Sequence, residues 1–411
     1  MDSDSEQVVC RKATVTDVLT VFLINYLAHA VTVLISPGSS HIAAGDAGLW
    51  SLLVPYKGIY AALRIIARQA CFGRDALERA RRAGALCCVY KVVQDPSGSI
   101  AYTYDNNLQT FTVAPLSLSS ANASIHGLIH LPAGYDITLL PRDYSVQPLA
   151  ISPSSGKTAT GYTSNTISCD YNFVKIAASL AQTIAGSLTV YQASKAQFAL
   201  FGFTQSSLTV IPYILMSLTN LAANITCPNY STLYLVETDL LEEAKGLGGF
   251  AHGTVGYVSE WNLTHPHPAA RVFKKALYLI GIGLVALPFI LIGFWTKFQP
   301  GPESTTEEKG WIWSWLITSI MFGVPVGYVQ KHTYTHSLKF LGDISSVFWR
   351  VIKGGNLKFH QKVLVGAVAM TLATLALVIN VVIGTAIFVT PIGMFVTVGR
   401  QIIKVGICKM V

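Results

Sequence analysis

The sequence predicts an α-helical multi-pass membrane protein of about four to six spans that carries a small β-rich extramembrane unit. Of its 411 residues, 51% are hydrophobic and only 12% are charged, whereas soluble domains carry about 25% charged residues. The mean hydropathy is +0.47, and several apolar runs reach the roughly 20 residues that cross a bilayer. Between these runs, one region alternates short strand-like stretches with turn residues, which is typical of a small β unit.

The predicted segments begin and end where apolar runs, charge and turn residues change along the chain. They are, in order, an N-terminal tail (1–14), the first transmembrane helix (15–36), basic interfacial helices (49–91), the β-rich extramembrane unit (92–172), two helices (173–223), a polar extramembrane segment (224–275), a transmembrane hairpin (276–330), a basic loop (331–362), the C-terminal transmembrane region (363–398) and a tail (399–411). The second of the two helices, at 198–222, contains Gln205, Pro212 and Asn220, so it either spans or re-enters the membrane.

The first predicted span carries three polar groups, Asp17, Asn25 and His29, in an apolar helix. Asn25 and His29 are four residues apart and therefore share a helix face. Ionisable groups inside a span are functional candidates by default, which makes Asp17 and His29 the candidate catalytic residues. The alternative is that Asn25 and His29 hydrogen-bond to a neighbouring helix, since polar side chains commonly hold packed spans together.

Positive charge is concentrated in two segments and bears on topology. Residues 49–91 hold eight Lys/Arg and two Asp/Glu, and residues 331–362 hold six Lys/Arg and one Asp. A basic, amphipathic segment of this kind belongs at the surface of an anionic leaflet. The positive-inside rule therefore places both segments on the cytoplasmic side, which requires an even number of crossings between them.

Four Asn-x-Ser/Thr sequons favour a different sidedness. A used N-glycosylation site lies in the lumen or outside the cell, so each of these asparagines, if glycosylated, would place its segment there. The charge rule carries more weight, because three-residue sequons arise often by chance. Together the features predict an integral protein of the secretory pathway or plasma membrane. The candidate glycosylation sites are Asn122, Asn224, Asn229 and Asn262.

Two histidine pairs are the candidate metal ligands. His126 and His130, and likewise His332 and His336, are four residues apart, and either a helix or a strand places both members of such a pair on one face. Two imidazoles do not complete a metal site, and the sequence contains no His-Glu-x-x-His motif. The sequence therefore predicts no cofactor.

Composition and motifs also exclude several classes of protein. The seven cysteines contain no Cys-x-x-Cys pair, which argues against a zinc ribbon or a redox motif. The net charge of +8 fits either nucleic acid or an anionic membrane surface, but no nucleic-acid-binding motif is present. We therefore expect the partners to be membrane lipids and another protein, not nucleic acid.

Two short motifs resemble catalytic sites but lack the rest of their pattern. Tyr191 and Lys195 have the Tyr-x-x-x-Lys spacing of short-chain dehydrogenases, yet no glycine-rich dinucleotide-binding turn precedes them. Residues 155–158, Ser-Gly-Lys-Thr, resemble the end of a phosphate-binding loop, but Ile151 stands where that loop needs glycine. Neither motif predicts an enzyme.

Four stretches together resemble a large group of uncharacterised fungal multi-pass integral membrane proteins. They are Asp17–Val33, Ala80–Leu86, His126–Tyr135 and Phe201–Leu221. The resemblance covers most of the chain from about residue 15 to residue 260, together with the membrane-bound C-terminus. It implies multi-pass membrane placement and adds no catalytic residue.

The leading functional hypothesis is an integral membrane protein that acts through membrane lipids or protein partners. The absence of a complete catalytic motif argues against an enzyme. The alternative is a membrane-embedded enzyme on a lipophilic substrate, with histidines as acid/base groups or metal ligands. A channel or transporter ranks third, because the sequence shows no inverted repeat.

Overall fold

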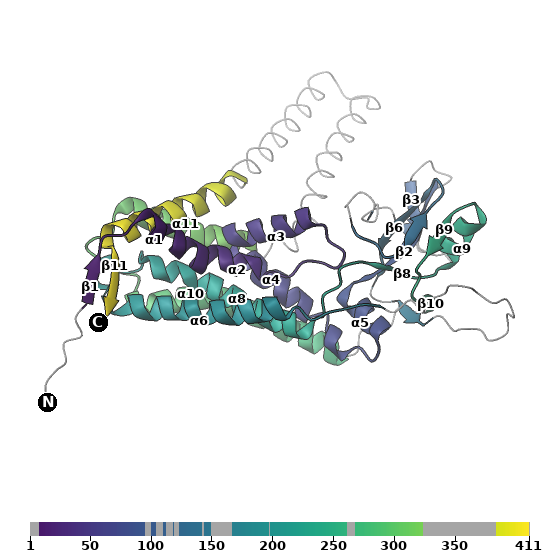
Figure 1. Ribbon diagram of the computed structural model, residues 1–411, viewed down its shortest axis with the longest axis horizontal. Helices are drawn as coiled ribbons and strands as arrows, with labels where there is room; N and C mark the ends of the chain where they lie inside the picture. The colour runs from purple at the N-terminus through teal and green to yellow at the C-terminus, as the bar shows by residue number, and fades with distance from the viewer. Residues whose placement is uncertain are drawn as a thin grey trace, which may run out of the picture.

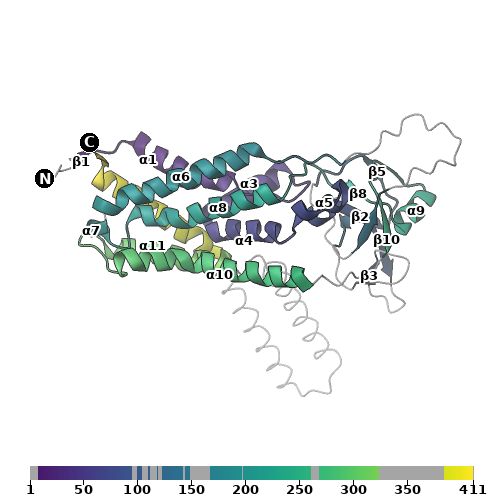
Figure 2. The same cartoon turned by 90° about the horizontal axis from the view of Figure 1, so that it is seen from below.

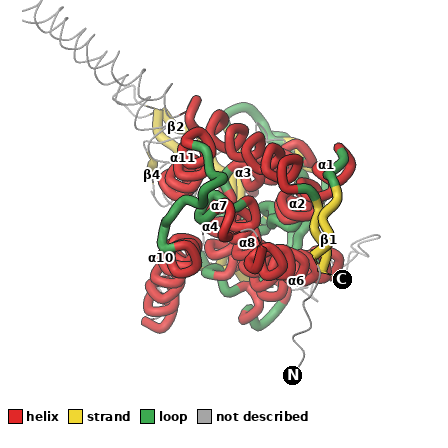
Figure 3. The backbone as a smooth tube through the Cα atoms, turned by 90° about the vertical axis from the view of Figure 1, so that its left-hand side faces the viewer, coloured by secondary structure: helices red, strands yellow, loops and turns green. Residues whose placement is uncertain are grey.

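The computed structural model describes residues 8–94, 100–103, 110–111, 118, 123–141, 144–148, 167–196, 198–260, 268–323 and 384–410. Within these ranges, most residues are helical. The helices form an elongated bundle, and all the described strands except β1 (Val8–Arg11) and β11 (Ile407–Met410) gather in a separate unit at one end of it (Figure 1). Figure 3 looks along the bundle from the opposite end, where both chain termini lie.

The bundle is built from segments of both halves of the chain. Its helical elements are α1 (Val15–Phe22), the π-helical turn η1 (Leu23–Leu27), α2 (Ala28–Val31), α3 (His41–Leu53), α4 (Pro55–Ile66), α6 (Phe173–Ala196), α7 (Phe198–Phe201), the 3-10 turn η3 (Ser206–Val210), α8 (Ile211–Thr226), α10 (Pro268–Thr296), α11 (Thr306–Gly323) and a C-terminal helix, Gly384–Val405.

Four of the described helices are long and apolar enough to cross a membrane, as an integral membrane protein requires. They are Phe173–Gln192, Ser206–Thr226, Lys275–Thr296 and Gly384–Val405. The second contains α8 and differs from the others, because 72% of it is buried inside the protein, against 17% for the span in α10. Helix α8 is therefore the centre of the bundle, between α6 and α4 (Figure 2).

Glycines allow the helices beside α8 to approach it closely. A Cβ at Gly58 of α4 would overlap the Met216 sulfur, and a Cβ at Gly186 of α6 would lie 2.7 Å from Ile214 Cγ1. Small residues commonly bring membrane helices together in this way, because packing takes the place of the hydrophobic effect within lipid.

Three predicted membrane segments differ in detail from the structure. The first predicted span, 15–36, forms α1, η1 and α2, a shorter apolar stretch over 15–31. The predicted hairpin at 276–330 contains α10, but α11 begins at Thr306 with two glutamates and a lysine, and it is not among the four long apolar helices. The C-terminal helix covers the end of the predicted 363–398 region, whereas residues 324–383, which include the basic loop, lie outside the described residues.

The strands beside the bundle form a sheet with two small strand pairs next to it, and we name this unit the extramembrane unit after its predicted position. The main sheet has the order β4-β3-β2-β6, and β8 pairs with β2 in parallel, while β5 pairs with β9 and β7 with β10. Its strands are β2 (Leu86–Gln94), β3 (Ile100–Thr103), β4 (Thr110–Phe111), β5 (Leu128–His130), β6 (Tyr135–Leu139), β7 (Ser145–Gln147), β8 (Tyr234–Leu235), β9 (Phe250–His252) and β10 (Tyr257–Glu260); η2 (Ala70–Phe72), α5 (Ala76–Ala83) and α9 (Asp239–Gly246) accompany them.

This unit joins two segments that the sequence analysis separated. The predicted β-rich unit was 92–172 and the predicted polar segment 224–275, but β9 and β10 of the second segment pair with β5 and β7 of the first. Strand β8 of the second segment pairs with Leu86 and Cys87 of β2, which lie in the segment 49–91 predicted as basic interfacial helices. The parallel pairing of Leu86 with Tyr234 crosses almost 150 residues of chain. Such long-range pairing leaves little local signal in a sequence.

One hydrophobic cluster joins the unit to the bundle. It combines Ala62 and Ile65 of α4 and Ala223 of α8 with Leu86 of β2 and Val236 next to β8, all nine-tenths or more buried. The bundle and the unit bury apolar surface against each other in this cluster, and this burial stabilises their contact. At the far end of the bundle, strand β1 (Val8–Arg11) pairs with β11 (Ile407–Met410), so the first and last strands of the described residues lie together.

Candidate functional site

Helix α8 carries a row of polar side chains on one face. Tyr213, Ser217, Asn220 and Asn224 follow at intervals of four, three and four residues, which places them along one side of a helix. All four are buried, and the last three hydrogen-bond to α6, or to α2 and the residues that follow it. Polar groups buried inside a membrane bundle must find partners in the protein, because lipid offers none.

The π-helical turn η1 brings polar residues of the first apolar helix into the bundle. Such turns are rare and occur frequently at functional sites. Here Asn25 and Tyr26 lie in the turn and are buried. The Tyr26 hydroxyl lies 2.7 Å from Thr209 Oγ1, and Asn25 Oδ1 accepts a hydrogen bond from Thr189 Oγ1 at 3.1 Å.

His29, in α2, is completely buried and faces Ser217. The distance between His29 Nδ1 and Ser217 Oγ is 2.7 Å. Ser217 Oγ donates to Gln182 Oε1 at 3.3 Å, so it accepts the hydrogen bond that His29 Nδ1–H donates. This arrangement fixes the neutral tautomer that leaves Nε2 as an acceptor. Among the described residues, no group makes a hydrogen bond of ordinary geometry to that Nε2.

A chain of hydrogen bonds continues from His29 toward the extramembrane unit. Thr32 Oγ1 donates to the His29 main-chain oxygen at 2.7 Å, and Asn220 Nδ2 donates to Thr32 Oγ1 at 3.2 Å. Asn224 Nδ2 donates to the Asn220 main-chain oxygen at 2.8 Å. We name these side chains the polar seam: His29, Thr32, Gln182, Ser217, Asn220 and Asn224.

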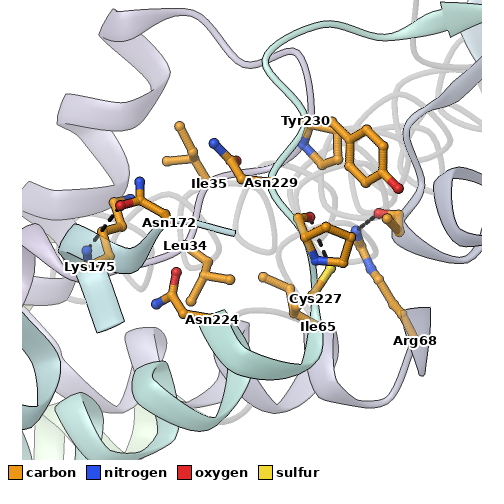
Figure 4. Close-up of a pocket in the computed structure, with 13 residues that line it drawn as sticks. Leu34, Ile35, Ile65, Arg68, Asn172, Lys175, Asn224, Cys227, Asn229 and Tyr230 are labelled. Atoms are coloured by element: carbon orange, nitrogen blue, oxygen red, sulfur yellow. Dashed lines mark hydrogen bonds between the residues drawn. The ribbon is translucent and has the colours of Figure 1, made fainter. Parts of the chain in front are cut away.

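The polar seam ends at a small cavity between the bundle and the unit (Figure 4). Asn224 and Leu34 line it from the bundle, and Asn229 and Tyr230 line it from the chain that enters the unit. Its volume is about 20 Å³, which is enough for one water molecule. We name it the junction cavity.

Two cationic side chains also line the junction cavity and hold its walls together. Lys175 Nζ donates to the main-chain oxygen of Val33, just beyond the end of α2, at 2.9 Å. Arg68 Nη1 donates to the main-chain oxygen of Ala83, the last residue of α5, at 2.5 Å. Cations at helix C-termini satisfy free carbonyl groups and interact favourably with the helix dipole.

A second concave surface lies on the extramembrane unit, and it is much larger. This groove has a volume of about 750 Å³ and is open to solvent. One wall is the segment around β5, including Leu128 and Ile129, and the other is formed by Tyr90, Tyr135 and Ile137 of β2 and β6. We name it the unit groove.

The structure gives Asp17 a capping position at the start of α1. Its carboxylate accepts hydrogen bonds from the Thr14 main-chain N–H and hydroxyl, at 2.8 and 2.7 Å, and both terminal nitrogens of Arg11 donate to it. Asp17 and Thr14 together form a capping box. None of these contacts joins Asp17 to His29, and a catalytic role for either residue stays a prediction.

His126 and His130, the histidine pair within the described residues, contact two different aromatic rings. The His126 ring packs against Tyr234, and the His130 ring stacks on Phe250. Within the described ranges, no three His, Cys, Asp or Glu side chains gather closely enough to hold a metal ion. His332 and His336 lie outside the described residues, and the metal site stays a prediction.

The structure places two of the four sequon asparagines. Asn224 is buried within α8 and its amide nitrogen is hydrogen-bonded, so this structure leaves no space for a glycan there. Asn229 is exposed at the junction cavity. Asn122 and Asn262 lie outside the described residues.

Sequence reasoning found His29 but missed its partners. Thr32, Gln182 and Ser217 were not candidate site residues, and Asn224 was a candidate for glycosylation only, although the spacing of polar residues in 211–226 carries the helical period. No family model, curated protein or solved structure matches this chain. The resemblance to the fungal group therefore stays a prediction, and function is argued from geometry.

Proposed function

We propose that this chain is an integral membrane protein that acts through contact with membrane lipids and with a protein partner. In this proposal the bundle is the anchor, and the extramembrane unit binds an extended polypeptide segment in the unit groove. The observation that carries it is the open groove on a unit that shares a hydrophobic cluster with the bundle.

The shape of the unit groove favours a polypeptide over a small molecule. Small-molecule sites bury about 70–90% of the ligand surface, which an open groove does not do. A polypeptide lies along such a surface with one side exposed. The lining includes Leu128, which is 63% exposed, and buried Ile137. Apolar side chains of a partner would bury this surface and gain the free energy of apolar burial.

Contact with lipid is supported by the outer surface of the bundle. Ile282, Phe289 and Met321, from α10 and α11, line an open groove that is almost entirely apolar. Many large apolar side chains of α10 are also exposed, including Leu279 at 67% and Phe294 at 78%. An exposed apolar surface of this extent is typical of a membrane-facing region.

Site-specific photo-crosslinking tests the partner proposal. A photoreactive amino acid replaces Leu128 in the unit groove or, as the matched control, Leu247, which is 62% exposed and outside it. We expect the photoreactive residue at position 128 to crosslink to one polypeptide through a single short segment. With the photoreactive residue placed instead at Val92, a second position in the unit groove, we expect Leu128→Arg to abolish crosslinking to that polypeptide. The proposal would be contradicted if positions 128 and 247 gave the same crosslinked products, or if position 128 gave no crosslinked polypeptide.

A membrane-embedded enzyme on a lipophilic substrate is the second candidate function. One observation favours it: Ser217 orients His29 so that its Nε2 remains an acceptor, as a general base requires. The lipid profile of cells that carry His29→Ala, compared with Tyr26→Phe, tests it. Accumulation of one lipid only in the His29 variant supports the enzyme, and unchanged profiles in both variants reject it.

A further inference from the structure

The polar seam contains two buried acceptor atoms that no described group satisfies. They are His29 Nε2 and Asn220 Oδ1, and both residues are fully buried. Buried polar atoms in folded proteins nearly always have a partner in the protein or in bound water. Neighbouring atoms of the same side chains do have partners, since His29 Nδ1 meets Ser217 and Asn220 Nδ2 meets Thr32. The two side chains are therefore held in place with one acceptor each left over.

Both acceptors belong to the same hydrogen-bonded chain, and this chain reaches the junction cavity. Asn220 connects to Asn224 through its main-chain oxygen and to His29 through Thr32. Asn224 is also a lining residue of the cavity. The contacts thus connect a cavity of water size at the end of the bundle to the main-chain oxygen of His29 inside it, and the imidazole of His29 joins α8 through Ser217.

The chemistry of the two acceptors selects the ligand. Each requires a donor, and a water molecule supplies two O–H donors while it accepts from neighbouring groups. Anions supply no donor for them. A divalent metal ion needs four or more ligands, commonly including thiolate or carboxylate, and no described cluster of such residues exists.

We infer that the polar seam binds water, which enters from the junction cavity and reaches His29 Nε2. Through this water, His29 exchanges protons with the aqueous phase on the side of the extramembrane unit. Lys175 and Arg68 keep the cavity open by bonding the ends of two helices. The inference does not depend on the partner proposed for the unit groove.

Hydroxyl-radical footprinting of the full-length protein in lipid nanodiscs tests the inference. Radiolysis of bound water produces radicals in place, which oxidise the nearest histidine and tyrosine side chains. We expect oxidation of His29 and of Tyr230 at the cavity, although both are buried, and several-fold less oxidation of Tyr56. Tyr56 is equally buried but lies in the hydrophobic cluster of the bundle.

A blocking variant identifies the route. Asn224→Leu replaces the polar side chain between the cavity and the seam, whereas Asn229→Leu makes the same change at an exposed lining residue. We expect Asn224→Leu to reduce His29 oxidation several-fold and to spare Tyr230, and Asn229→Leu to change neither. If His29 in the native protein is oxidised as little as Tyr56, the seam is dry and the inference is wrong, even if Asn224→Leu fails to fold. Unchanged oxidation of His29 in a folded Asn224→Leu variant would overturn the proposed route.

Discussion

Replacing Ser217 by alanine removes the side-chain hydroxyl that hydrogen-bonds to the His29 ring and changes the side-chain volume very little. The bond between His29 Nδ1 and Ser217 Oγ is short, at 2.7 Å, and both residues are completely buried. Hydrogen bonds between membrane helices contribute about 0.6 kcal/mol on average and up to about 1.7 kcal/mol. A buried donor left without an acceptor costs about 1–3 kcal/mol. We therefore expect Ser217→Ala to lower the free energy of unfolding by about 1–2 kcal/mol.

Unfolding in mixed detergent micelles, followed by circular dichroism, measures this loss. The control is Ser187→Ala in α6, where the serine is exposed and its hydroxyl donates only to the main-chain oxygen of Thr183. A surface change of this kind shifts stability by no more than about 0.5 kcal/mol. A double-mutant cycle with His29→Leu isolates the pairwise interaction, for which we expect a coupling of about 1 kcal/mol.

Two results would refute this reasoning. If Ser217→Ala loses no more stability than Ser187→Ala, the buried contact does not stabilise the bundle. If the single variants each lose stability but their effects add, His29 and Ser217 do not interact directly, and the tautomer inferred for His29 loses its basis.

Three further predictions concern the extramembrane unit. Burial raises the pKa of the Cys88 thiol to about 12, so at pH 8 maleimide should modify the half-buried Cys71 while Cys88 stays unmodified; equal rates would contradict this. Gly127 has a φ of +90° and a Cβ there would overlap a main-chain oxygen of β9, so Gly127→Ala should cost about 1–3 kcal/mol and speed amide exchange in β5. The hydrogen bond from Lys91 lowers the pKa of Glu243, so this half-buried pair stabilises the unit, by about 0.2–1 kcal/mol, above the ordinary glutamate pKa of about 4.3. That stabilisation disappears as the pH falls through the lower folded-state pKa, and Glu243→Gln should remove this part of the acid dependence of thermal unfolding.

Local patterns predicted the elements that depend on local sequence. The apolar run at 276–298 matches the span in α10, whereas β2 begins at Leu86, inside the segment 49–91 predicted as basic interfacial helices. The prediction failed to join β8, β9 and β10 to the unit, because each is only two to four residues long and pairs with distant strands. Strands this short carry too few residues for a period-two pattern.

Only part of the candidate site was predictable, because the contacts of its residues also depend on segments that are distant in the sequence. Asn25 and His29 stood out because they interrupt an apolar run, and the structure places both in hydrogen bonds to neighbouring helices. Ser217 and Thr32 did not stand out, because serine and threonine are common in membrane helices, where they bond to their own main chain. Their role depends on which helix lies opposite, and a sequence read one helix at a time does not contain that information.

The central position of α8 explains why its span was the hardest to assign. Hydropathy measures how well a helix tolerates lipid, but α8 is surrounded by α2, α4, α6 and α10, so its polar face meets protein instead. Because of Gln205, Pro212 and Asn220, the sequence left open whether the run at 198–222 spans or re-enters the membrane. In the structure Pro212 lies in the first turn of α8, where proline is tolerated, and Asn220 is a member of the polar seam. The features that weakened the assignment of a span are thus those of a helix enclosed by others, and in this chain that enclosed helix carries the candidate functional site.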